Sequence, residues 1–129
     1  MKLFIRSDEW SERWNFVDDN NVVLGYCAEP CCCEHFGFKI ISGGAEVADH
    51  KTDIEATNAV LDGFEFDPEF AEVANASEED SDQCSGVAEF RATRGDAEIR
   101  IRLFNYHNGY YSHGFAFSRG ESEIRSGYL

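Results

Sequence analysis

Two runs of alternating apolar and polar residues, 87–94 and 97–105, flank the dipeptide Gly95-Asp96. A glycine in the first position of a two-residue loop is typical of a type II′ hairpin turn. This turn pairs Arg94 with Ala97 and fixes the partners along both strands. The expected apolar pairs are Ala92–Ile99, Phe90–Ile101 and Ala88–Leu103. The other face pairs Glu89 with Arg102, and it pairs Arg91 with Arg100, which is unfavourable unless each arginine finds an acid.

A third strand is expected after this hairpin, beyond Asn108-Gly109. A two-residue turn there would place Phe115 and Phe117 on the charged face. A three-residue loop, His107 to Gly109, with a G1 bulge places them on the apolar face and buries more apolar surface. We therefore predict sequential antiparallel strands at 87–94, 97–106 and 110–118 in one sheet. The predicted cross-strand pairs are Ile99–Phe117, Ile101–Phe115 and Leu103–His113. The shared buried face comprises Phe90, Ile99, Ile101, Leu103, Phe115 and Phe117.

The first half of the chain predicts a second hairpin and a short helix. Strands at 14–17 and 22–27 flank the turn cluster 18–21, and a third strand at 36–41 directs Phe36, Phe38 and Ile40 to the core. Residues 52–55 have the form of a capping box, which predicts a helix that ends near Asp62-Gly63. A short strand is expected at 64–66, and 71–86 is expected to be an exposed acidic loop. The predicted fold is a single α+β domain over 1–129, mainly antiparallel β.

The charge distribution limits the partners that this chain can bind. It has 25 acidic and 11 basic residues, and 52–90 contains 12 acids and no Lys or Arg. This balance argues against nucleic acids and anionic membranes as ligands. Two interpretations remain open, namely a solvated acidic face with cross-strand ion pairs and an acidic surface for a basic protein partner.

The compartment is expected to be the cytoplasm. The N-terminal residues become acidic too early for a signal peptide, and no apolar run approaches the roughly 20 residues of a membrane span. The sequence leaves the oligomeric state open.

Five cysteines stand at positions 27, 31, 32, 33 and 84. Cys27, Cys31, Cys33 and His35 are candidate zinc ligands, although their spacing lacks two separated Cys-x-x-Cys units. The alternatives are buried cysteines that act as small apolar side chains, a redox function that includes a bond between adjacent cysteines, and a nucleophilic pair of Cys33 with His107 or His113. Acidic surroundings disfavour the thiolate that such a nucleophile requires.

A polar pocket at one end of the sheet is the second candidate site. Its expected lining is Cys32, Cys33, Glu34, Tyr110, Tyr111 and His113. Glu34 needs hydrogen-bond donors or solvent because an isolated buried carboxylate is costly. The alternative is that Glu34 pairs locally and that the tyrosines only close the sheet edge.

Two of these motifs carry a resemblance. Cys32-Cys33-Glu34, followed after two later strands by Asn108-Gly109-Tyr110-Tyr111-Ser112, resembles a family of small uncharacterised bacterial and phage proteins. The resemblance covers about residues 13 to 118. This chain departs from the family pattern at Cys31, where the family tends to have Asp, and at His113, where an acid is common. The resemblance implies the order of the strands and a spatial meeting of the two motifs, and it implies no activity.

Two functions follow as expectations. The first is a small, non-enzymatic, acidic module that binds a protein partner, of the immunity or phage-accessory type. The second is a metal- or thiol-dependent protein centred on Cys27 to His35. The sequence contains no phosphate-binding loop, no Gly-x-Ser-x-Gly and no His-Glu-x-x-His motif, and no catalytic residue is predicted.

Overall fold

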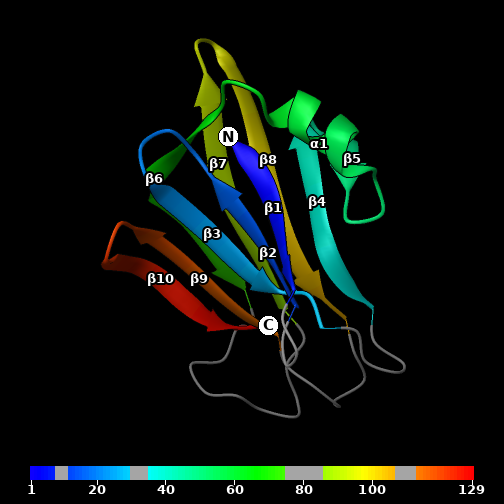
Figure 1. Cartoon of the computed structure of the whole chain (residues 1–129), viewed down its shortest axis with the longest axis vertical. Coiled ribbons are helices and arrows are strands. Elements are labelled where there is room, and N and C mark those ends of the chain that lie inside the picture. Colours follow the sequence, from blue (N-terminus) through cyan, green and yellow to red (C-terminus); the bar gives the residue numbers. More distant parts are fainter. Residues whose placement is uncertain (8–11, 30–34, 75–85, 107–112) are drawn as a thin grey trace.

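The computed structural model describes residues 1–7, 12–29, 35–74, 86–106 and 113–129, which form two five-stranded antiparallel sheets packed face to face (Figure 1). Sheet A has the order β1-β2-β3-β9-β10, and sheet B has the order β5-β4-β8-β7-β6. The strands of sheet A are β1 (Lys2–Ser7), β2 (Glu12–Val17), β3 (Val22–Cys27), β9 (Gly114–Arg119) and β10 (Ser122–Tyr128). Those of sheet B are β4 (Phe36–Ser42), β5 (Ala45–Asp49), β6 (Glu65–Ala74), β7 (Gly86–Arg94) and β8 (Ala97–Asn105). The expected class, mainly antiparallel β with one short helix, is confirmed.

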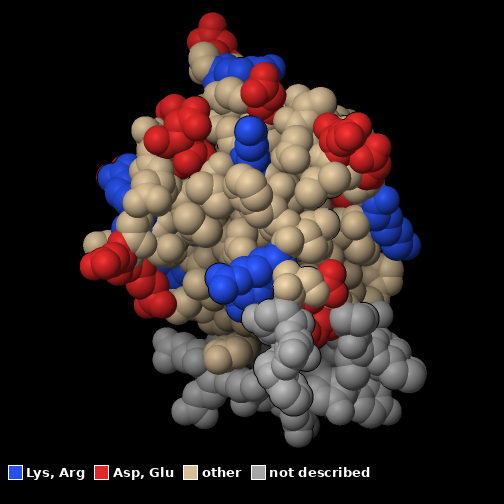
Figure 2. Space-filling model, viewed as in Figure 1, with Lys and Arg blue, Asp and Glu red and all other residues tan. Residues whose placement is uncertain are grey.

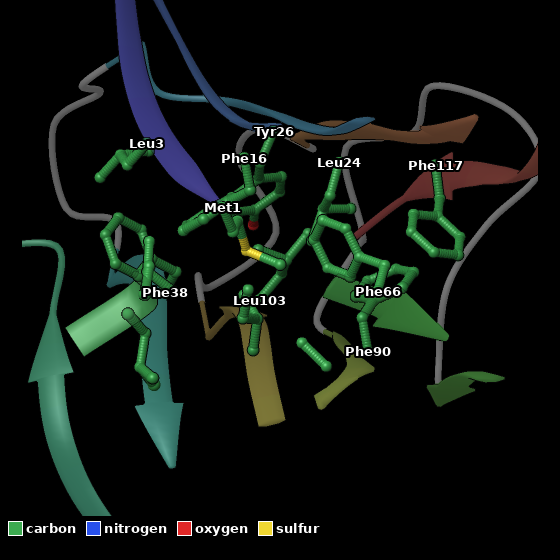
Figure 3. Close-up of a cluster of buried hydrophobic side chains, with 14 of the residues drawn as sticks. Met1, Leu3, Phe16, Leu24, Tyr26, Phe38, Phe66, Phe90, Leu103 and Phe117 are labelled. Carbon is green, nitrogen blue, oxygen red and sulfur yellow. The ribbon is translucent and has the colours of Figure 1, made fainter. Parts of the chain in front are cut away.

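Aromatic side chains from both sheets fill the space between them (Figure 3). Phe16 of β2 meets Phe38 of β4 edge to face, with ring centroids 5.0 Å apart. The ring centroid of Phe117 of β9 lies 4.8 Å from that of Phe90 of β7. These rings are fully buried or nearly so, and each buried aromatic side chain contributes roughly 1.5–3 kcal/mol relative to its exposed state. The core of the domain is therefore the interface between the sheets.

The β7–β8 hairpin has the register expected from its loop. Arg94 pairs with Ala97, and the apolar pairs follow as predicted. Gly95 has a φ of 58°, which a type II′ turn requires at this position. The arginines that lie opposite one another both find acids, because Arg91 pairs with Asp67 and Glu98, and Arg100 pairs with Glu89.

The predicted three-stranded meander is wrong. β9 lies in sheet A and pairs with β3, so Phe117 lies opposite Leu24 and Phe115 opposite Tyr26. The predicted pairs of β9 with β8 are therefore absent, and the strand begins at Gly114 and ends at Arg119. The six residues assigned to a common face do share one core, but Phe115 and Phe117 enter it from the opposite sheet.

The helix α1 (Ile54–Leu61) starts one residue later than the capping-box pattern suggests. Asp53 is the N-cap, and its carboxylate accepts a hydrogen bond from the Glu55 N–H. The Thr52 hydroxyl instead accepts a hydrogen bond from the Asp49 N–H, which joins the helix to β5. In the part of the chain that the structure describes, no helix has the length and apolar character needed to cross a bilayer.

The region after the helix is more extended than predicted. β6 continues through Pro68 to Ala74, with an irregularity between Phe66 and Ala71. Residues 71–74 are therefore strand rather than loop, and 75–85 lie outside the described residues. Proline is tolerated here because β6 is an edge strand, where one side of the backbone needs no ladder partner.

Asp18 joins the two sheets where the β2–β3 turn meets β6. Its buried carboxylate accepts hydrogen bonds from the N–H groups of Asn20 and Val22 through Oδ1 and from the Phe66 N–H through Oδ2, each at 2.9 Å. The first two bonds shape the turn, and the third reaches sheet B.

Candidate functional site

The strand ends that flank the predicted pocket gather at one end of the sandwich (Figure 1). Phe36, at the start of β4, pairs with Asn105, at the end of β8. The Tyr106 N–H extends this pairing with a hydrogen bond of 2.7 Å to the His35 carbonyl. His35 directly follows segment 30–34, and Tyr106 directly precedes segment 107–112. The end of the first predicted motif and the start of the second are therefore attached at neighbouring points.

His113 is the most constrained of the predicted pocket residues. It is 2% exposed, and its ring stacks on Phe36 with a centroid distance of 3.9 Å and an interplanar angle of 16°. Its Nδ1 lies 3.3 Å from the Cys27 carbonyl oxygen. In the tautomer that carries the proton on Nδ1, the ring donates a hydrogen bond to this oxygen. Its backbone exchanges two hydrogen bonds with Leu129. His113 therefore connects the ends of β3, β4 and β10.

Two further polar side chains link the sheets at this end. The Tyr26 hydroxyl on β3 donates to the Phe104 carbonyl on β8 at 2.9 Å. The Asn105 Nδ2 on β8 donates to the Leu129 carbonyl at 2.9 Å. All these groups are buried, where unpaired polar groups would be costly, so the bonds fix how the sheets meet. The sequence patterns gave no signal for these two residues, because their partners are backbone groups distant in sequence.

The structure places three of the predicted site residues. Cys27 is half-buried at the end of β3, His35 is exposed before β4, and His113 is buried beside Phe36. The remaining candidates, Cys31, Cys32, Cys33, Glu34, Tyr110 and Tyr111, lie outside the described residues. The distance from the Glu34 carboxylate to the tyrosines therefore stays a prediction.

The described residues hold no cluster of three or more His, Cys, Asp or Glu side chains suited to a metal ion. The contact between Cys27 and His113 uses the cysteine carbonyl oxygen and not its thiol. With Cys31 and Cys33 outside the described ranges, a zinc site stays a prediction without geometry.

An aromatic cluster lies beside the candidate pocket, on the outer side of sheet B. Tyr106 is 51% exposed and stacks on Phe104 at 5.2 Å, and His35 lies 5.5 Å from the same ring. The ring of His50 also lies near Phe104, with a centroid distance of 5.9 Å. Gly37 makes room for this histidine, because a Cβ at position 37 would lie 2.2 Å from the His50 Nδ1. Tyrosine and histidine rings of this kind offer both apolar contact and hydrogen bonding to a partner.

The charges on the outer face of sheet B are largely paired with one another. Glu89 accepts hydrogen bonds from both Arg100 and Arg102. Arg91 donates to Asp67, and this bond holds the pKa of the Asp67 carboxyl below its usual range. Cross-strand ion pairs therefore account for Asp67, Glu89 and Glu98 on this face, as one interpretation of the charge pattern expects.

No family model, no curated protein and no solved structure matches this chain.

Proposed function

We propose that this chain is a non-enzymatic module that binds a basic protein partner in the cytoplasm through the end of the sandwich that carries His113. The described residues that flank four segments of the sequence, 8–11, 30–34, 75–85 and 107–112, lie at this end. Their anchor points are close in the ladders, since Ser7 pairs with Glu12, Ala74 with Val87, and Gly86 with Asn105.

The observation that carries the proposal is the charge of these segments. They contain seven acids and none of the 11 Lys and Arg residues of the chain. The acids are Asp8, Glu9, Glu34, Glu78, Glu79, Asp80 and Asp82. Tethering so many like charges to one end of a small domain attracts a basic surface and accelerates its association.

The contrast with sheet B supports the choice of this end. On the outer face of sheet B, Asp67 and Glu89 already have basic neighbours in the same domain, so these two acids offer less to a partner. The exposed Tyr106 and His35 beside the acidic segments supply the apolar and hydrogen-bonding contacts that interfaces commonly use.

The test compares two variants in which the same charge is removed from different places. The acidic-segment variant carries Glu78→Gln, Glu79→Gln, Asp80→Asn and Asp82→Asn. The matched control carries Asp19→Asn, Asp96→Asn, Glu121→Gln and Glu123→Gln at exposed positions elsewhere. Each protein is immobilised and incubated with cytoplasmic extract. A zero-length cross-linker then joins its carboxylates to the amines of any protein that it has retained.

We expect the unmodified chain and the control to retain the same basic protein, cross-linked through carboxylates of the acidic segments. The acidic-segment variant should retain at least about tenfold less, which corresponds to about 1.4 kcal/mol of binding free energy. Retention should also fall as salt rises. Equal retention by both variants, or cross-links confined to other faces, would overturn the proposal.

A further inference from the structure

The edge of sheet A at β1 differs from the other three edges among the described strands. The pairing of β10 shifts between Glu123 and Arg125, that of β5 is irregular, and β6 contains Pro68 within an irregular stretch. Bulges, prolines and covering helices are the devices that protect sheet edges from further strands. The helix α1 reaches the β1 edge at Leu3, but β1 pairs with β2 without interruption from Lys2 to Ser7. It is therefore the most regular edge that the described sandwich offers.

The backbone of β1 presents hydrogen-bonding groups to solvent. The Leu3 N–H points away from β2, because it donates to the Asn58 Oδ1 of α1 at 2.7 Å. Alternate residues of an antiparallel strand direct their backbone groups the same way, so the groups of Ile5 and Ser7 also point outward. The Asn58 side chain thus accepts the hydrogen bond that a neighbouring strand would accept, but it does so only at Leu3. No described residue accepts a hydrogen bond from the Ile5 N–H.

The side chains along this edge are partly apolar and basic. Phe4 is 51% exposed and Ile5 is 50% exposed. Lys2 and Arg6 share the outer face with Phe4, and Arg6 lies directly opposite Arg13 of β2. Figure 2, which has the same view as Figure 1, shows a largely uncharged surface with isolated basic groups near its middle and most acidic groups toward its margin.

The Arg6–Arg13 pair needs a neighbouring acid. Arginines that lie directly opposite each other repel, as at Arg91 and Arg100 of sheet B, where each has described acidic partners. No described acid forms an ion pair with Arg6 or Arg13. A carboxylate on a strand added next to Arg6 would supply this partner at the usual cross-strand distance of about 5 Å.

We propose that β1 binds an extended segment of another protein, which alternates acidic and apolar residues and adds a sixth strand to sheet A. Its backbone would pair with Ile5 and Ser7, its acids would lie beside Lys2 and Arg6, and its apolar residues would cover Phe4 and Ile5. A second copy of this chain fits less well, because it brings a second Lys2 and Arg6 to the same edge. This surface adjoins the acidic end at Ser7, but it binds a partner of the opposite charge.

The probe is a capped, fluorescently labelled peptide of sequence Thr-Glu-Val-Ile-Val-Glu, whose binding is measured by fluorescence anisotropy. A peptide with Lys in place of both Glu residues is the charge control. The protein variant Ile5→Pro removes an outward N–H together with the isoleucine side chain, and proline is tolerated at such edge positions. Ile5→Val is its matched control, because it keeps the N–H and the β-branched side chain. Circular dichroism checks that both variants fold.

We expect the acidic peptide to bind the unmodified chain and Ile5→Val within about threefold of each other and Ile5→Pro at least about tenfold more weakly. The Lys peptide should bind at least about tenfold more weakly than the acidic one. If Ile5→Pro does not fold, N-methylation of the peptide backbone removes the reciprocal bonds, which the peptide N–H groups donate to the outward carbonyls of β1, and it should weaken binding equally. The proposal is overturned if the acidic peptide fails to bind, if the Lys peptide binds as well, or if sedimentation shows that β1 pairs with a second copy instead.

Discussion

Replacing Asp18 with alanine should destabilise the sandwich more than replacing any exposed acid. The substitution removes the acceptor for three backbone N–H groups, and those of Val22 and Phe66 are buried. A buried donor left without a partner costs about 1–3 kcal/mol, so two such donors cost about 2–6 kcal/mol. Removal of a buried carboxylate offsets part of this loss, because that group no longer has to be desolvated. We expect the free energy of unfolding to fall by about 3 kcal/mol, a large share of the 5–15 kcal/mol typical of a domain.

The assay is urea unfolding followed by tryptophan fluorescence, with the free energy taken from the midpoint at a shared slope. Asp18→Asn separates the two carboxylate oxygens, because the amide keeps one acceptor and turns a donor toward one of the N–H groups. Its expected cost is about half that of Asp18→Ala, roughly 1.5 kcal/mol. Asp19→Ala is the control, since the neighbouring Asp19 is exposed and its loss should change stability by less than about 0.5 kcal/mol.

Equal destabilisation by Asp18→Ala and Asp19→Ala would refute this reasoning. A loss below about 1 kcal/mol for Asp18→Ala would also refute it, because the two buried N–H groups would then have found other partners.

Three further outcomes are expected. The hydrogen bond from Arg91 lowers the pKa of Asp67 in the folded state. The ionised Asp67 carboxylate therefore contributes its full stabilisation above the ordinary Asp pKa of about 3.9, and this stabilisation is lost as the pH falls through the lowered pKa. Asp67→Asn should therefore reduce the loss of stability measured by acid titration below about pH 4. Gly37→Ala should cost about 1–3 kcal/mol in thermal unfolding, because its Cβ would collide with the His50 ring. Elemental analysis of untagged protein should find substoichiometric zinc, and one zinc per chain would instead support the alternative centred on Cys27.

The sequence predicted local pairing well because a hairpin register depends on few residues. Gly95-Asp96 sets the loop, and every later pair follows from the two-residue period of the strands. The error over β9 has the same origin. The alternation of apolar and polar residues shows that Phe115 and Phe117 face a core. It does not show whether their strand lies beside β8 in the same sheet or across the core in the opposite sheet, because both arrangements produce the same pattern.

The missed strands share a different physical cause. β1, β5 and β10 are sheet edges, where at most one residue of each strand is buried and the two-residue period is weak. The strand β10 has no fully buried residue, so its position is fixed by backbone pairing with β9 rather than by its side chains. Backbone pairing leaves no signature in composition, and the sequence therefore predicts no strand after residue 118.

The candidate pocket shows how a partly wrong topology still located a coherent end of the molecule. The expectation that the Cys-Cys-Glu and Tyr-Tyr segments meet came from a resemblance and from a meander that does not exist. In the structure their flanks meet because β4 runs antiparallel to β8, so that the residue before β4 lies beside the residue after β8. His113 then reaches Phe36 because the chain crosses to sheet A before β9 begins. Both arrangements join elements about 70 residues apart in sequence, and local patterns carry no information about such pairings. The sequence shows which residue types flank these strand ends, whereas their geometry depends on which sheet each strand joins.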